Sequence, residues 1–152
     1  MAQVRGKDTK PELALRRALR AAGVPFTTFR KTLPGNPDVV LSAFKTVVFV
    51  HGCFWHSHTC RRGSRPKTNQ VFWNLKLDKN KLRDQACQRQ LRRAGWSVSV
   101  IWECSLNIGI SRLIGRLSRA ADLQEVRGKK RANFGGTAFP IIRAAGARCP
   151  FG

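Results

Sequence analysis

The feature that most constrains the fold of this 152-residue chain is a short window that contains all three of its histidines. His51, His56 and His58 fall within eight residues, and Cys53 and Cys60 lie in or directly beside the same stretch. Histidines scattered through a core do not cluster in this way, and the window shows neither helical nor strand periodicity. A loop of this kind has little other than a bound metal to give it one shape.

The cysteines and one histidine of the window have the spacing of metal ligands. Cys53, His58 and Cys60 supply three ligands, and a closed zinc site needs four. Cys104 is the best candidate for the fourth, because it ends a predicted strand that should run beside the strand leading into the window. We therefore predict a structural Zn²⁺ site. Five cysteines, an odd number, without a signal-peptide pattern favour reduced thiols over disulfides.

Short apolar runs on both sides of the window predict a small β-sheet. Residues 38–41 and 46–50 are rich in β-branched side chains and too short for helices, and the spacing between them suits a hairpin turn. Residues 97–103 predict a third strand, and residues 24–30 could form a further short one. The stretch between the second and third strands opens with an irregular loop over 51–73.

Three helices are predicted around this sheet. The first begins at Thr9, whose hydroxyl should accept from the amide three residues on while Glu12 reaches back to it. The other two are predicted over 78–94 and 106–123. Apolar spacing gives the inward sides of the first two helices, which are Leu15, Leu19 and Ala22 in one and Leu82, Ala86 and Leu91 in the other. Helices around a small mixed sheet predict an α/β sandwich.

Charge divides the chain into basic flanks and a neutral centre. There are 29 Lys and Arg against 8 Asp and Glu, a net charge of +21, yet residues 32–60 hold only Lys45 and Asp38. This pattern indicates a reactive site inside a phosphate-binding surface, so nucleic acid is the expected partner. No apolar run reaches the roughly 20 residues that span a bilayer, so no membrane is expected. We predict one domain over 1–125 and a basic, poorly ordered tail over 126–152.

Asp38 is the only carboxylate of the neutral centre, and it begins a predicted strand directly after Pro37. Mg²⁺ prefers oxygen ligands and is held by one or two carboxylates together with a substrate phosphate. His51 and His56 lie outside the zinc set, and an imidazole beside such an ion could take a proton from an attacking water. Asp38 alone would more often be a turn cap, but its combination with two histidines favours a hydrolytic site.

The chain resembles the very-short-patch repair endonucleases, which nick DNA beside a T:G mismatch left by deamination of 5-methylcytosine. The resemblance covers about residues 5–104, and the run from His51 to Cys60 is its most specific part. The motifs that carry it, in chain order, are Thr9-Lys10-Pro11-Glu12, Pro34-Gly35-x-Pro37-Asp38, Phe49-x-His51-Gly52-Cys53-Phe54-Trp55-His56-x-His58-x-Cys60, Phe72-Trp73-x-x-Lys76-x-x-x-Asn80-x-x-Arg83-Asp84, Gly95-Trp96-x-Val98 and Trp102-Glu103-Cys104.

The resemblance implies a restriction-endonuclease-like α/β core that carries out Mg²⁺-dependent phosphodiester hydrolysis. Asp38 looks like the catalytic metal ligand, and the main-chain carbonyl of Val50 looks like a second one. His56 resembles the histidine that activates water, with His51 beside it, and Glu12 resembles a further active-site acid. The family's structural zinc site matches the four ligands named above.

The resemblance also assigns residues to DNA. Phe54, Trp55 and Trp73 look like aromatic wedges that enter the base stack at the mismatch, where opening a step costs least. Lys76 and Asn80 lie on the stretch where the family reads the mispair. Taken alone, such aromatics are more often core residues, and such a helix face is more often only solvated.

The expected partner is therefore double-stranded DNA with a T:G mismatch, bound by a monomer in the bacterial cytoplasm as a nucleoid-associated activity. Mismatch-repair proteins and a repair polymerase are further partners that the resemblance suggests. The chain begins close to Thr9, so we expect a short version of the N-terminal arm with which the family clasps DNA. Two alternatives stay open: a related restriction-type nuclease, and a catalytically impaired zinc-containing DNA-binding protein. Val50, where the best-known members carry a hydroxyl residue, keeps the second one open.

Overall fold

A mixed three-stranded sheet forms the centre of the computed structural model, which describes residues 8–28 and 32–132 and the side chains up to residue 123. β1 (Val39–Leu41) pairs antiparallel with β2 (Thr46–His51), and β2 pairs in parallel with β3 (Ser97–Trp102). The order is β1-β2-β3, so β3 is an edge strand. The three main predicted strands and the hairpin between the first two are confirmed.

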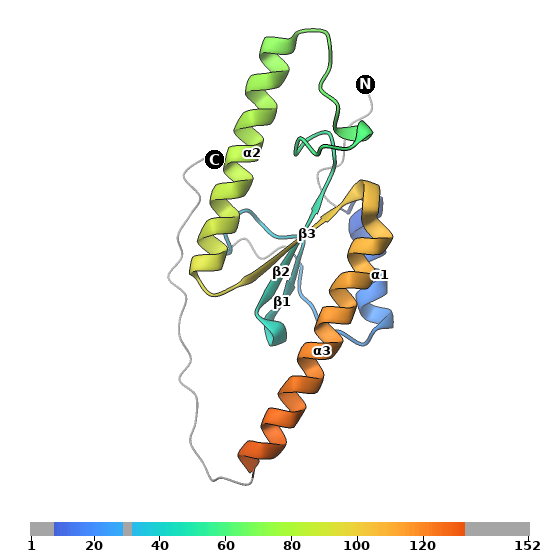
Figure 1. Cartoon of the computed structure of the whole chain (residues 1–152), viewed down its shortest axis with the longest axis vertical. Helices are drawn as coiled ribbons and strands as arrows, with labels where there is room; N and C mark the ends of the chain where they lie inside the picture. The colour runs from blue at the N-terminus through green and yellow to red at the C-terminus, as the bar shows by residue number, and fades with distance from the viewer. Residues whose placement is uncertain (1–7, 29–31, 133–152) are drawn as a thin grey trace.

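Helices cover both faces of this sheet, as Figure 1 shows. α1 (Lys10–Ala21) and α3 (Leu106–Ala132) pack on one face, and α2 (Gln70–Arg93) packs on the other. The architecture is the predicted restriction-endonuclease-like α/β sandwich. Short 3₁₀ turns connect some elements, at Ser42–Phe44, Arg61–Gly63 and Glu103–Ser105.

Strand alternation supplies both cores, because successive side chains of a strand point to opposite faces. Val48 of β2 joins the core under α1 and α3, whereas Val47 and Phe49 join the core under α2. Leu15 and Leu19 of α1 are fully buried, as predicted. The same alternation places His51, at the end of β2, on the α2 side of the sheet.

The N-terminal region departs from prediction in two places. Thr9 donates its hydroxyl proton to Glu12 Oε1 at 2.8 Å instead of accepting from a backbone amide, and Glu12 Oε2 accepts from the Asp8 amide at 3.0 Å. Ala22 follows α1 and is exposed. The strand predicted over 24–30 is wrong for the part that is described: a single bridge joins Thr27 to Val40, and residues 29–31 lie outside the described ranges.

α2 differs more strongly, in both its start and its buried face. It begins at Gln70, so the predicted loop ends earlier than expected and Trp73 lies on the helix. Leu77, Cys87 and Leu91 are its buried residues, whereas Leu82, predicted to face inward, is 63% exposed and Ala86 is half-buried. The buried residues follow the strip that faces the sheet, and the few apolar residues of this helix do not all lie on that strip.

α3 extends to Ala132, beyond the predicted end at residue 123. Most of the tail predicted over 126–152 lies outside the described residues, which end at 132. Among the described residues, none of the helices combines the length and apolar character that a membrane crossing requires.

Candidate active site and metal centre

A cleft of about 400 Å³ opens where β1 begins, β2 ends and α2 passes over the sheet. Five chemically active groups line it: Asp38, Val50, His51, His56 and Asp84. Glu12 of α1 lines it as well. The structure thus brings together every residue that the sequence proposed for catalysis, and adds Asp84, to which no role was given.

Asp38 joins the start of β1 to the end of β2. Its amide donates to the Val48 carbonyl at 3.1 Å, and the Val50 amide donates to Asp38 Oδ2 at 2.7 Å. In a strand, the amide and carbonyl of one residue point to the same side, so the Val50 carbonyl should lie on the Asp38 side of β2. Burial raises the pKa of Asp38 to about 6, against the lowering effect of the Val50 hydrogen bond. The cleft therefore holds a carboxylate whose charge the protein does not fully compensate.

The two histidines of the cleft stack on each other. The ring centroids of His51 and His56 are 3.8 Å apart with an angle of 8° between the planes. Burial, and then the neighbouring His56, lower the pKa of His51 to about 4, so His51 is neutral at neutral pH. His56 contacts Asp84 Oδ2 through Nδ1, a pairing that fixes the ring and leaves Nε2 to act on a water or a substrate.

Asp84 is the functional residue that the sequence analysis missed. It belongs to one of the motifs that carry the family resemblance, but the inward side predicted for its helix does not include it. The signal was present, because Asp84 lies seven residues from Leu77 and seven from Leu91, both of which are buried. A carboxylate at that spacing shares the buried face of a helix, where an acid needs a partner such as the His56 imidazole.

Glu12 has its hydrogen-bonding capacity largely occupied by its own helix. It accepts from Thr9 and the Asp8 amide, and Arg16 Nη2 approaches its Oε2 at 3.2 Å, while Arg16 also pairs with Asp8. The side chain is buried and still borders the cleft. Glu12 therefore holds the N-terminus of α1 against the site, and any catalytic part it plays comes in addition to this.

The second cluster is the predicted zinc set. The ligand atoms of Cys53, His58, Cys60 and Cys104 all lie within 4.8 Å of one another. Cys104 reaches the loop because it follows β3, whose last residue is paired in register with His51 at the end of β2. A hydrogen bond with His58 lowers the pKa of Cys60 to about 6, whereas burial raises that of Cys53 to about 11. Three sulfurs and one imidazole nitrogen are the donors that Zn²⁺ takes in closed tetrahedral sites.

The loop that carries these ligands folds tightly on itself. A Cβ placed on Gly63 would lie 1.9 Å from the carbonyl oxygen of His58, so only glycine fits there. Cys53, Cys60 and Cys104 are free thiols, as expected.

Aromatic side chains gather between the tip of this loop and the N-terminal end of α2. Ring centroids are 5.1 Å apart for Phe54 and Trp55, and 5.4 Å apart for Phe54 and Trp73. The ammonium group of Lys76 lies 5.6 Å from the Trp55 ring and 5.5 Å from the Trp73 ring. Asn80 donates to the Trp55 carbonyl at 3.3 Å. All five residues proposed from the sequence for DNA contact therefore lie in one cluster.

The same region exposes apolar surface that the sequence analysis did not assign. Val71 is 74% exposed, Leu75 is 69% exposed and Phe72 is 48% exposed. The Phe72 ring contacts Trp73, with centroids 5.3 Å apart. Large apolar side chains exposed together indicate a surface that meets another molecule.

Comparison with known proteins shows which family combines these features. The family model "DNA mismatch endonuclease Vsr" matches residues 1–62. The DNA mismatch endonuclease Vsr of Escherichia coli is 39% identical over 106 residues, which are 70% of this chain and 68% of that protein. The type II nicking enzyme V.XorIIP of Xanthomonas oryzae pv. oryzae is 47% identical over 107 residues, covering 70% of this chain and 79% of the relative. The chain belongs to the Vsr family.

The other relatives agree with this assignment. The type II nicking enzyme V.NmeAIP of Neisseria meningitidis is 44% identical over 106 residues, which cover 70% of this chain and 76% of that enzyme. As a Vsr-family member the protein is a DNA endonuclease, which hydrolyses phosphodiester bonds. The residues matched by the Vsr family model include Asp38 and the whole window from His51 to Cys60.

Proposed function

We propose that this endonuclease nicks the thymine-containing strand at T:G mispairs that arise from deamination of 5-methylcytosine. The observation that carries the proposal is the convergence of Asp38, Val50 and the paired His56 and Asp84 in one cleft beside a cluster of aromatic rings. The names of the relatives, a mismatch endonuclease and several nicking enzymes, support cleavage of one strand. Hydrolysis would leave a 5′-phosphate and a 3′-hydroxyl.

The donor atoms around Asp38 fit Mg²⁺. A carboxylate and a main-chain carbonyl are hard oxygen ligands, and the raised pKa of Asp38 reflects a buried charge that a cation would neutralise. We propose that Asp38 and the Val50 carbonyl hold this ion. When bound, Mg²⁺ would supply positive charge to a phosphodiester oxygen as negative charge develops on it.

His56 is proposed as the general base. Asp84 holds its Nδ1, which orients the ring and stabilises the imidazolium that forms when Nε2 takes a proton from the attacking water. His51, stacked against it and neutral, fixes the plane of the ring and can exchange hydrogen bonds with a substrate oxygen. Glu12 keeps α1 in place at the edge of the same cleft.

The aromatic cluster is proposed to recognise the mispair. Phe54, Trp55 and Trp73 present rings at several angles near the tip of the loop, which suits insertion between base pairs. A mismatched step opens at lower cost than a paired one, so insertion selects for damage. Lys76 and Asn80 lie at the base of these rings, where they could contact base edges or phosphates.

The Cys and His cluster is proposed as a structural Zn²⁺ site that fixes the loop between the catalytic cleft and the aromatic cluster. It takes no part in hydrolysis, because four protein ligands leave no open position. We further propose that the enzyme acts as a monomer in the bacterial cytoplasm and passes nicked DNA to mismatch-repair proteins and a polymerase.

A nicking assay tests the proposed function. End-labelled duplexes that differ only in a T:G or a C:G pair are incubated with the protein, with Mg²⁺ or with Mg²⁺ withheld, so that no chelator removes zinc. We expect a nick only in the T:G duplex, only with Mg²⁺, and a loss of about 1,000-fold or more in the Asp38→Ala variant. Asp78→Ala is the matched control, because Asp78 lies exposed on α2 and pairs only with Arg65 among the described residues.

The other results identify the alternatives. Equal cleavage of both duplexes would favour a restriction-type nuclease. Binding without cleavage would favour a DNA-binding protein with an impaired catalytic core. A nicking rate that is unchanged in Asp38→Ala would contradict the metal site itself.

A further inference from the structure

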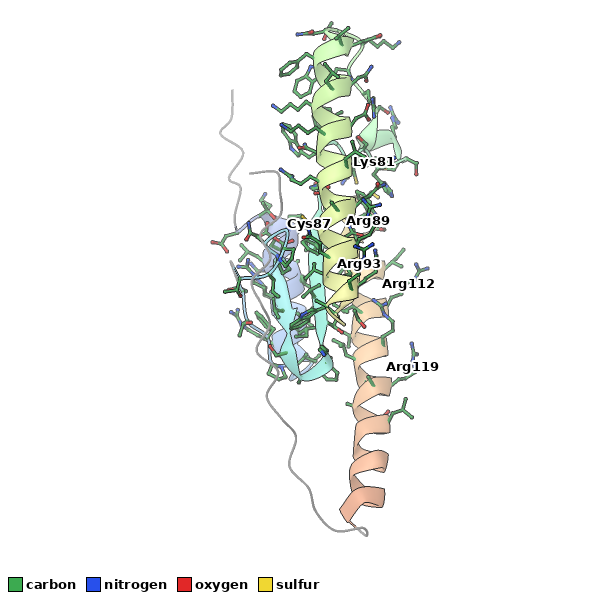
Figure 2. The ribbon with its side chains drawn as sticks, turned by 90° about the vertical axis from the view of Figure 1, so that its left-hand side faces the viewer. Lys81, Cys87, Arg89, Arg93, Arg112 and Arg119 are labelled. Atoms are coloured by element: carbon green, nitrogen blue, oxygen red, sulfur yellow. The ribbon has the colours of Figure 1, made fainter. Side chains whose placement is uncertain are left out.

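A second basic surface lies on the far side of α2 from the catalytic cleft. Figure 2 shows Cys87, which lines the cleft, on one side of α2 and Arg89 and Arg93 on the opposite side. Arg112 and Arg119 of α3 project toward that same side in Figure 2. We call these four arginines, together with Lys81 and Arg116, the basic face. None of these six residues is among those to which catalysis and mispair recognition are assigned, although Lys81 lines a hollow that also reaches His56 and Asp84.

The basic face borders a groove along the free edge of the sheet. A hollow of about 660 Å³ lies between β3 and α3, with Val100 and Trp102 on its floor and Arg112, Arg116 and Arg119 on its wall. A smaller hollow of about 270 Å³ shares Val100 and Trp102, extends to Lys81 of α2 and continues to His51, His56 and Asp84 at the border of the catalytic cleft. Within the described part of the chain, β3 pairs only with β2, so no strand covers this edge.

Unbalanced charge sets this groove apart from the rest of the surface. Among the described residues, Arg89, Arg93, Arg112 and Arg119 form no ion pair with a carboxylate. No acidic residue occurs between 85 and 93 on α2 or between 106 and 121 on α3. Arg116 donates to the Ser99 hydroxyl at 2.9 Å, which holds one guanidinium at the groove. Cations crowded together in this way repel one another, and binding of an anion lowers the free-energy cost of this repulsion.

The spacing of the arginines favours a polyanion. Arg112 and Arg119 are seven residues apart, about 10 Å of helix, and that length of duplex axis carries about six phosphates. An acidic peptide added to β3 would fill the groove, but it would leave Arg89 and Arg93 of α2 without contacts. The cations are spread over a wider surface than one extended peptide could contact.

We propose that the basic face is a second DNA-binding site, which takes the phosphate backbone of a second duplex segment while the cleft holds the first. We expect binding there to be independent of base sequence, because arginines that contact phosphates carry no sequence information. The site would let one endonuclease molecule bridge two DNA segments and stay bound near a lesion. The proposal does not depend on the T:G specificity proposed above.

A bridging assay tests this second site. Full-length protein is bound to a bead-attached T:G duplex without Mg²⁺, washed, and then offered a fluorescent, fully paired duplex at several salt concentrations. The protein should capture the second duplex. The Arg112→Ala/Arg119→Ala variant should capture it about 10-fold less well, with a salt slope smaller by about two. Its single-turnover nicking rate at saturating protein should stay within about 2-fold of the parent.

Two further variants test whether the position of the charges and the shape of the groove determine capture. Arg17→Ala/Lys45→Ala removes two exposed cations outside the basic face and should leave capture unchanged. Gly115→Leu keeps all the charges but fills the groove, and a Cβ there meets nothing within 4 Å, so the fold should tolerate it. We expect it to lower capture as well.

Several results would overturn the proposal. These are capture that is unaffected by loss of Arg112 and Arg119, an equal loss in the Arg17 and Lys45 control, or no effect of Gly115→Leu. Preference of the immobilised complex for a fluorescent polyglutamate peptide over the duplex would replace DNA with an acidic protein partner. Failure of nicking with capture intact would count against the proposed catalytic function and not against this site.

Discussion

The end of β2 and the loop that follows it supply side chains to two groups that differ in most of their donor atoms. His51 and His56 turn into the catalytic cleft, whereas Cys53, His58 and Cys60, which alternate with them along the chain, turn into the Cys and His cluster. The first group is open to a cleft and offers imidazole beside carboxylate oxygens. The second offers mainly sulfur. Neighbouring residues of one short stretch of chain therefore line two separate sites.

The two groups also differ in the residues that reach them from other parts of the fold. Asp38 and Asp84 reach the cleft from β1 and α2, and Cys104 reaches the cluster from the turn after β3. Trp102 stands between them, with its ring centroid 5.3 Å from that of His51 and 4.2 Å from that of His58. Changes on one side should alter folding and changes on the other should alter rate, which the following variants test.

Cys53→Ser should have the largest effect. Removing a buried zinc ligand takes away most of the binding free energy of a structural site, of the order of 10 kcal/mol in small zinc domains, so the variant should lose its metal and its folded loop. Metal analysis should find about one zinc per chain in the parent and far less in the variant, and circular dichroism should show unfolding or aggregation. Thr59→Ala, an exposed neighbour in the same loop, is the control. Unchanged zinc content in Cys53→Ser would remove Cys53 from the ligand set.

Asp84→Asn should leave the fold intact and slow hydrolysis. The amide still fits beside His56, but it cannot stabilise the imidazolium as a carboxylate does, and partners of this kind are typically worth about 10- to 100-fold. We expect kcat to fall by that factor with KM and DNA affinity little changed. Asp78→Asn, an exposed carboxylate on the same helix, should keep full activity. A rise in KM at constant kcat would show that Asp84 positions DNA and not the base.

The sequence revealed local groups better than it revealed their partners. The proposed zinc ligands, Asp38 and the two histidines of the cleft could be named because their spacing, or their place beside a strand end, is a property of the chain itself. The three main strands followed from short β-branched runs for the same reason. The parallel pairing of β2 with β3 then explains why Cys104 could be placed beside the loop.

Features that depend on packing were harder to predict. α2 carries only a few apolar residues on its buried strip, so apolar spacing predicts an inward side that includes the exposed Leu82 and leaves out Asp84. The strand expected over 24–30 reduces, in its described part, to one bridge at Thr27, because β1 is only three residues long and offers little edge to pair with. In each case tertiary contacts outweighed a weak local signal.

The smallest predicted effect is a change in the stability of an Asp38→Asn variant. Loss of the Asp38 carboxylate should raise stability, whereas it should lower activity. Because burial raises the pKa of Asp38 to about 6, the folded state favours the protonated acid, and its contribution to stability falls as the pH rises from the unfolded value through the folded one. Above that range the cost is at most about 3 kcal/mol. Asp38→Asn should therefore raise the Tm of the Mg²⁺-free protein at about pH 7.5, and the gain should shrink toward about pH 5. Added Mg²⁺ should raise the Tm of the parent and not that of the variant.

Asp78, whose pKa is lowered by Arg65, gives the contrasting control, since Asp78→Asn should not stabilise at any pH. Equal Tm values for parent and Asp38→Asn across this range would mean that the protein already compensates the carboxylate charge, and the case for a cation at Asp38 would lose its electrostatic basis.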